Sequence, residues 1–140
     1  MSDQNLAANR ASFAAWNAHD ATQWLKSFAE DAVFESETVP TSPLKGHAGL
    51  RQVFDLYHSA FPDTKLEILQ EIASGPFVVA RTKASGTHHG SLGAIPATHR
   101  HVSFEICFIA EYRNGKIIHT RNFWDTATML RQLGVMPQQT

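Results

Sequence analysis

Asp125 is the residue of this 140-residue sequence whose type and position most suggest chemistry. It stands at the junction of a predicted strand (115–124) and a predicted helix (126–133). Strict alternation along the strand places four further residues on its face: Ile117, His119, Arg121 and Phe123. Burial among aromatic side chains would raise the pKa of the carboxyl group and suit it to proton transfer. The same position suits a helix N-cap, which lowers the pKa of a carboxyl group, and the two roles do not exclude each other.

Eight histidines are the second source of candidate chemistry. The pairs His88-His89 and His99-x-His101 contain the side chain that most often binds transition metals. His88 and His89 point to opposite faces of a strand, and the other pair lacks a defined third ligand, so we predict no metal site. His88 is either a hydrogen-bonded core residue or a group that orients a substrate or transfers protons.

Two further residues can be interpreted from their position. Arg121 would carry its charge on the interior face, which is costly without a carboxylate or an anionic ligand, whereas a strand bulge near Asn122 would turn it outward. Cys107 is the single cysteine and lies in the apolar segment 104–110. A buried thiol there acts as a small hydrophobic group, so we do not predict a nucleophile.

The elements that would position these residues change period near residue 64. Before it, apolar residues recur three and four apart, which predicts helices over 4–18, from Asp20 to about Glu30, and over 47–61. A short strand (32–38) and a loop with Pro40, Ser42, Pro43 and Gly46 separate the last two helices. Beyond residue 64 the period is two, which predicts four strands: 64–73, 76–89, 98–112 and 115–124. Helices followed by hairpin-connected strands predict an α+β fold with an antiparallel sheet.

Alternation also predicts which strand residues face the interior. The third long strand would turn six residues inward: Val102, Phe104, Ile106, Phe108, Ala110 and Tyr112. On the preceding strand the inward residues include Ala80, Thr82, Ala84 and Gly86, whose small side chains leave room for a ligand. The opposite face carries Ser103, Cys107 and Ile109, and burying this apolar surface against a second copy predicts a homodimer.

Composition sets the class of protein. Hydrophobic residues make up 43% of the chain, which predicts a folded single domain over 1–140. A formal net charge of −1 provides no basic field, so we predict no binding to nucleic acid. The sequence has no run of 18 apolar residues and no secretory signal at its start, which predicts a cytoplasmic protein without membrane association.

Several short motifs together resemble one protein family. They are Gly86-Thr87-His88-His89-Gly90, the segment 93–98, Asn114-Gly115-Lys116-Ile117, Asp125, and Gln132-Leu133-Gly134. In order and spacing they are similar to the SnoaL-like polyketide cyclases and the related ester cyclases, whose fold is the nuclear transport factor 2-like cone. The resemblance implies an intramolecular aldol-type reaction that needs neither metal nor cofactor. It also implies that Asp125 is the acid/base and that His88 orients the substrate carbonyl.

The predicted substrate site combines these residues with interior aromatic and polar side chains. Its predicted binding residues are Trp16, Phe34, Phe54, Phe104, Phe108, His119, Arg121 and Phe123. The sequence departs from the family pattern at Ala97, His99 and Arg121. An inward Arg121 favours a smaller or anionic ligand over a flat aromatic polyketide. Two alternatives stay open: a small-molecule-binding or dimerisation module without catalysis, and an epoxide hydrolase-like activity.

Overall fold

The computed structural model describes residues 2–36 and 43–136. Four helices are present in these residues: α1 (Ser2–Asn17), α2 (Ala21–Lys26), α3 (Gly46–Ala60) and α4 (Thr126–Leu133). The strands are β1 (Phe28–Ser36), β2 (Leu44–Lys45), β3 (Lys65–Ser74), β4 (Phe77–Thr87), β5 (His101–Arg113) and β6 (Lys116–Trp124). None of the described helices is long and apolar enough to cross a membrane.

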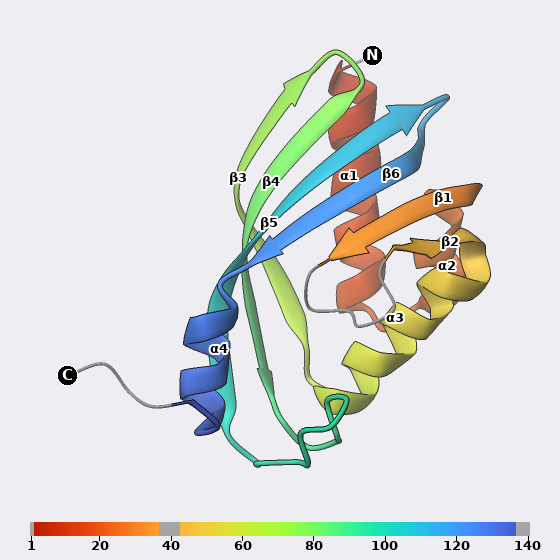
Figure 1. Ribbon diagram of the computed structural model, residues 1–140. Coiled ribbons are helices and arrows are strands. Elements are labelled where there is room, and N and C mark those ends of the chain that lie inside the picture. Colours follow the sequence, from red (N-terminus) through yellow and green to blue (C-terminus); the bar gives the residue numbers. More distant parts are fainter. Residues whose placement is uncertain (1, 37–42, 137–140) are drawn as a thin grey trace.

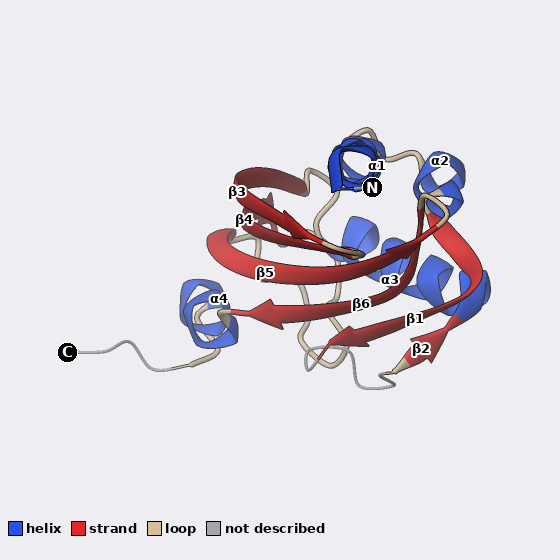
Figure 2. Cartoon of the chain, turned by 90° about the horizontal axis from the view of Figure 1, so that it is seen from above, coloured by secondary structure: helices blue, strands red, loops and turns tan. Residues whose placement is uncertain are grey.

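The strands form one curved, open sheet in the order β2-β1-β6-β5-β4-β3 (Figure 1). Neighbouring strands are antiparallel except β1 and β6, which run parallel. Seen from above, the long strands bend strongly and α1, α2 and α3 lie on the same side of the sheet (Figure 2). Helix α4 follows β6 and packs against β5. The predicted α+β fold, with N-terminal helices on a curved sheet, is confirmed.

The boundaries of the second helix and first strand differ from the prediction. Asp20 does cap α2, since its carboxylate accepts the backbone N–H of Gln23 at 3.1 Å, but the helix ends at Lys26 rather than near Glu30. Phe28 therefore belongs to β1, which begins four residues before the predicted strand. β2 was not predicted. Pro40 and Ser42 of the predicted loop, and the predicted strand end at 37–38, lie outside the described residues, whereas Gly46 is the first residue of α3.

The interior face of β5 follows strict alternation. Val102, Phe104, Ile106, Ala110 and Tyr112 are buried, and Phe108 is half-buried, as predicted. The inward residues of β4, including Ala80, Thr82 and Ala84, are also buried. Burial of this shared apolar face against α1 and α3 provides the main stabilising contribution to the fold.

A bulge in β6 reverses the predicted parity of that strand. Ile117 pairs with Tyr112 and His119 with Glu111, so Ile118 is an extra residue without a partner in the ladder. Beyond this point the even residues face inward: Thr120 and Asn122 are buried, whereas Arg121 and Phe123 are exposed. The prediction that Arg121, Phe123 and Asp125 face the interior is therefore wrong. A bulge does turn Arg121 outward, but it lies before that residue and not near Asn122.

Candidate functional site

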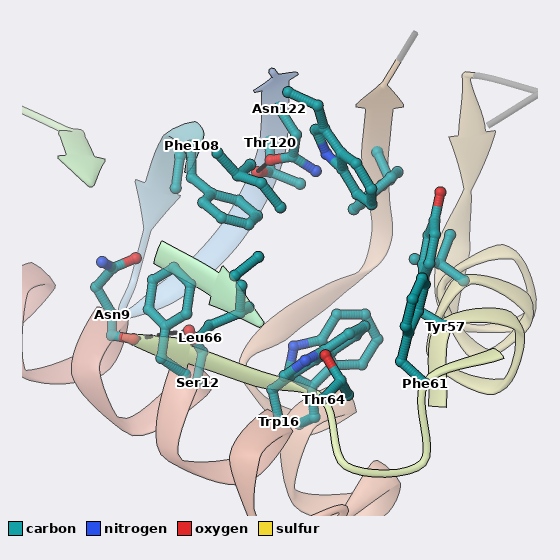
Figure 3. A pocket seen from close by; sticks show the side chains of 18 of the residues that line it. Asn9, Ser12, Trp16, Tyr57, Phe61, Thr64, Leu66, Phe108, Thr120 and Asn122 are labelled. Atoms are coloured by element: carbon teal, nitrogen blue, oxygen red, sulfur yellow. Dashed lines mark hydrogen bonds between the residues drawn. The ribbon is translucent and has the colours of Figure 1, made fainter. Parts of the chain in front are cut away.

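A cavity of about 90 Å³ lies between the helices and the concave face of the sheet (Figure 3). A space of this size accommodates several waters or a small organic molecule. Its walls are apolar for the most part. The residues that line it are Asn9, Ser12, Phe13, Trp16, Trp24, Phe28, Phe34, Val53, Tyr57, Phe61, Thr64, Leu66, Ala84, Ser85, Val102, Phe104, Ile106, Phe108, Ala110, Ile117, Thr120, Asn122 and Trp124.

Three buried N–H groups on these walls have no hydrogen-bond partner: Trp16 Nε1, Asn122 Nδ2 and Trp124 Nε1. Asn122 and Trp124 are two residues apart on β6 and share its inner face, while Trp16 comes from α1. The Thr120 hydroxyl donates to Asn122 Oδ1 at 3.2 Å and so orients the amide. A buried donor without an acceptor costs free energy, so these groups are candidates to donate to ligand oxygen atoms.

The polar residues at the α1 side of the cavity are already paired. Ser12 Oγ donates to the Asn9 carbonyl at 2.7 Å, and the Tyr112 hydroxyl donates to Asn9 Oδ1 at 2.9 Å. Asn9 Nδ2 contacts Glu71 Oε2 at 3.4 Å. Burial, with the nearby Glu71 carboxylate, raises the pKa of the Tyr112 hydroxyl far above its usual range, so this network stays protonated.

No carboxylate, histidine, lysine or arginine is found among the described residues that line the cavity. Tyr57 is the one titratable side chain on the described walls. Within residues 2–36 and 43–136, no three His, Cys, Asp or Glu side chains gather in a way that would hold a metal ion. The described walls therefore present hydrogen-bond donors and apolar surface rather than charged side chains.

Asp125 is exposed and caps α4 instead of lining the cavity. Its carboxylate accepts the Thr128 hydroxyl at 2.7 Å and the Thr128 backbone N–H at 3.3 Å. These hydrogen bonds lower the pKa of the Asp125 carboxyl group. Of the two roles that the sequence left open, this geometry matches the cap; the acid/base role stays a prediction.

We expect Asp125→Asn and Asp125→Ala to separate the two roles. Asparagine caps helices about as well as aspartate, so Asp125→Asn should keep the melting temperature within a degree or two of wild type, whereas Asp125→Ala should lose about 1 kcal/mol. Thermal unfolding measures both variants. If Asp125→Asn were destabilised as much as Asp125→Ala, the carboxylate charge, and not the cap, would be what stabilises this junction.

His88 is completely buried and does not line the cavity. Its Nδ1 accepts the Thr98 backbone N–H at 3.1 Å, which leaves the hydrogen on Nε2, an atom without a partner. The ring packs on Phe61, with centroids 5.4 Å apart, and Phe61 does line the cavity. Burial, reinforced by the charges of His99 and His89, lowers the pKa of His88. His88 thus lies directly behind the cavity wall.

The lowered pKa values of His88 and His58 predict a loss of stability in mild acid. Burial also lowers the pKa of His58, more than its contacts with the Trp16 and Phe54 carbonyls raise it. Both histidines bind protons more readily in the unfolded chain, where their pKa is near 6.5. The contribution of the two neutral histidines to the free energy of unfolding should therefore be fully present above pH 6.5. It should decrease as the pH drops below that value.

Urea unfolding at pH 7.5, 6.5 and 5.5 measures this effect. The paired carboxylates Glu35, Asp63 and Asp125, whose pKa values are lowered, lose their contribution only at more acidic pH. His88→Asn should flatten the dependence between pH 7.5 and 5.5. An unfolding midpoint that is the same at all three pH values in wild type would contradict the prediction.

The structure brings together half of the predicted substrate-binding residues. Trp16, Phe34, Phe104 and Phe108 line the cavity. Phe54 is buried behind it and packs edge-on against Trp16. The other three lie away from the cavity because of the β6 bulge: Glu35 Oε2 accepts from His119 Nε2 at 3.0 Å and from the Arg121 guanidinium at 2.6 Å, and Phe123 is 48% exposed.

Sequence reasoning missed the polar part of the cavity, above all Asn122 and Trp124. Strict alternation, which turns Arg121 and Phe123 inward, leaves both on the opposite face. The signal that could have found them is the cost of an inward Arg121, because shifting the strand by one residue turns Arg121 outward and Thr120, Asn122 and Trp124 inward.

Solved structures with the same fold include three from Streptomyces. AclR, a candidate hydroxylase from Streptomyces galilaeus, gives a TM-score of 0.86 at 23% identity over 100% of this chain and 87% of that chain. IdmH, a candidate polyketide cyclase from Streptomyces antibioticus, gives 0.80 at 25% identity over 94% of this chain and 99% of that chain. TsrD from Streptomyces laurentii gives 0.86 at 22% identity over 97% of this chain and 98% of that chain.

The sequence comparisons give two results. No curated protein matches the chain. The model of the SnoaL-like polyketide cyclase family matches residues 7–133, which is most of the sequence and extends from within α1 to the end of α4.

Proposed function

Because the chain belongs to the SnoaL-like polyketide cyclase family, we propose that it is a cyclase- or isomerase-type enzyme that acts on a small uncharged carbonyl compound. Family membership supports this type of activity in general. The observation that carries the proposal is the apolar cavity with unpaired N–H donors on its walls. Such donors bind carbonyl oxygen, and the absence of charge on the described lining favours an uncharged ligand.

In this proposal Asn122 Nδ2 and Trp124 Nε1 donate to one carbonyl oxygen of the substrate. Hydrogen bonds to that oxygen stabilise the negative charge that develops there when an adjacent C–H loses its proton. The resulting enolate carbon then attacks a second carbonyl of the same molecule, a C–C bond forms, and the new alkoxide takes up the proton. No step requires a metal or cofactor. The apolar walls hold the two reacting carbons close together and exclude water.

The group that transfers the proton is either Asp125 or Tyr57. The family resemblance implies Asp125, which directly follows Trp124, whereas Tyr57 is the titratable side chain on the wall itself. Turnover of Asp125→Asn and Tyr57→Phe should be compared, because each removes one proton-transfer group and keeps most of the side-chain volume. The larger loss of kcat, with melting temperature retained, identifies the group.

The experiment that tests the proposed function is a screen of linear 1,4-, 1,5- and 1,6-diketones, whose intramolecular aldol reaction closes a five- or six-membered ring, with ring closure followed by NMR. Ala84→Leu is the matched control, since Ala84 lines the cavity and the added carbons would fill part of it. Wild-type protein should convert at least one compound and Ala84→Leu should convert it much more slowly. If no compound binds to wild type at millimolar concentration, the proposal is wrong.

A non-catalytic binding module is the second candidate, and one observation favours it. The described lining has a single titratable side chain, so a ligand could be bound without being transformed. Binding without turnover in the same screen would establish this alternative. The epoxide hydrolase-like activity has less support, because it would need interior charged residues, and neither Arg121 nor Asp125 lines the cavity.

We further propose that the chain forms a homodimer through the outer face of the sheet. Cys107 and Ile109 are half-buried on this face, next to Val79 and the exposed Phe123. Light scattering after gel filtration should give the mass of a dimer. Ile109→Glu should shift the protein to monomer, whereas Ala14→Glu, at an exposed position on α1 away from this face, should not. A monomeric wild type at tens of micromolar would exclude the dimer.

A further inference from the structure

Trp16 Nε1 is an unpaired donor that the proposed reaction does not use. Trp16 is 8% exposed, and its indole nitrogen is buried on the cavity wall without a hydrogen-bond partner. The ring is held by edge-on contacts with Trp24 and Phe54, whose centroids are both 5.3 Å away. It also packs on His58 at 4.4 Å. The position of the indole N–H is therefore fixed by its surroundings.

Trp16 and Asn122 face the cavity from opposite walls (Figure 3). Trp16 projects from α1, while Asn122 projects from β6 beside Thr120 and Phe108. Apolar side chains such as Leu66 and Phe108 line the space between them. A ligand whose single carbonyl oxygen binds on the β6 side therefore offers no acceptor to Trp16 Nε1. An N–H group without an acceptor is unfavourable inside an apolar site.

We propose that Trp16 is a specificity-determining residue that selects ligands with a second hydrogen-bond acceptor. One acceptor binds Asn122 Nδ2 and Trp124 Nε1, and the other binds Trp16 Nε1 across the cavity. The ligand class is an uncharged molecule with an oxygen acceptor toward each end and an apolar segment between them. This inference rests on the proposed function, because it takes carbonyl binding at Asn122 and Trp124 as given.

The indole N–H signals of the three tryptophans test the proposal directly in ¹⁵N-labelled protein. The probes are 2,5-hexanedione, 2,7-octanedione and 2,9-decanedione, each compared with the 2-alkanone of equal length. Their flexible chains adapt to the spacing of the donors. We expect the best diketone to move the Trp16 and Trp124 signals downfield, and the matched monoketone to move that of Trp124 alone. The diketone should bind about fivefold to tenfold more tightly than the monoketone, the effect of one net hydrogen bond.

Trp16→Phe removes the donor and keeps an aromatic ring, and it should bring the affinity for the diketone down to that for the monoketone. Trp24→Phe is the matched control, since Trp24 lines the same wall but its Nε1 is not among the buried atoms without a partner. That variant should retain the preference. If Trp16→Phe does not fold, the shift of the Trp16 signal in wild type decides the question.

Two results would overturn the inference, and only one of them would also overturn the proposed function. Equal affinity for diketone and monoketone, with an unmoved Trp16 signal, would overturn the role of Trp16 and leave the proposed function in place. Failure of every ketone to bind at millimolar concentration would overturn both, because carbonyl binding at Asn122 and Trp124 would then be absent.

Discussion

Gly90→Ala is expected to destabilise the protein by more than about 2 kcal/mol, because the new methyl group would collide with backbone. A Cβ at residue 90 would lie 2.3 Å from the Ser59 carbonyl oxygen at the end of α3. The backbone N–H groups of His89 and Gly90 both donate to the Ala60 carbonyl, at 3.0 and 3.1 Å. Movement away from Ser59 would break these bonds and displace the segment that joins β4 to β5. Urea unfolding measures the effect.

Gly93→Ala is the control for this substitution. Gly93 lies in the same connection, with open space around its Cβ position and a φ of +56°. Alanine there costs only the strain of a left-handed backbone, about 1 kcal/mol. If both variants were destabilised equally, the collision with Ser59 would not be the cause.

Asn122→Leu is expected to lower turnover by roughly 10²- to 10³-fold, the typical effect of removing one donor to a developing oxyanion. Folding should not suffer to the same degree. Asn122 is 3% exposed and its Nδ2 has no partner, so leucine of similar size removes an uncompensated buried donor, which offsets the loss of the acceptor of the Thr120 hydroxyl. We expect the melting temperature to stay the same or rise while kcat falls. Stability that is given up for function in this way is common at active sites.

Thr120→Val is the matched control for Asn122→Leu. It removes the hydroxyl that orients the Asn122 amide but leaves the donor in place, so the expected loss of kcat is about tenfold or less. Equal losses in the two variants would show that the orientation of the amide, and not its hydrogen bond to substrate, limits the reaction. If kcat of Asn122→Leu equalled that of wild type, Asn122 would have no role in the reaction.

Much of the fold could be predicted from the sequence by rules that involve only neighbouring residues. The inward face of β5 obeys alternation over its whole length because this central strand pairs with β4 without a register shift. Helix α4 begins after Asp125 and ends at Gly134, whose φ is +79°, as capping rules predict. These features depend on residues that are neighbours in sequence.

The lining of the cavity was harder to predict from the sequence, because one extra residue in a strand turns every later side chain to the opposite face of the sheet. Ile118 carries no sequence mark of a bulge, yet it decides whether Arg121 or Asn122 faces inward. The end of α2 was also misjudged, since Phe28 pairs with Ile117, a strand partner far along the chain. Periodicity alone cannot predict such long-range pairing.

The parallel pairing of β1 with β6 has a consequence for how the chain folds. Residues 28–36 find their partners at 117–122, so this contact must close a loop of most of the chain before it gives any stability. Hairpins β3–β4 and β4–β5 join residues much closer in sequence and can form earlier. On a ribosome, β1 would wait for the last strand to emerge. The cavity, with one wall on α1 and another on β6, would then be among the last parts of the molecule to take shape.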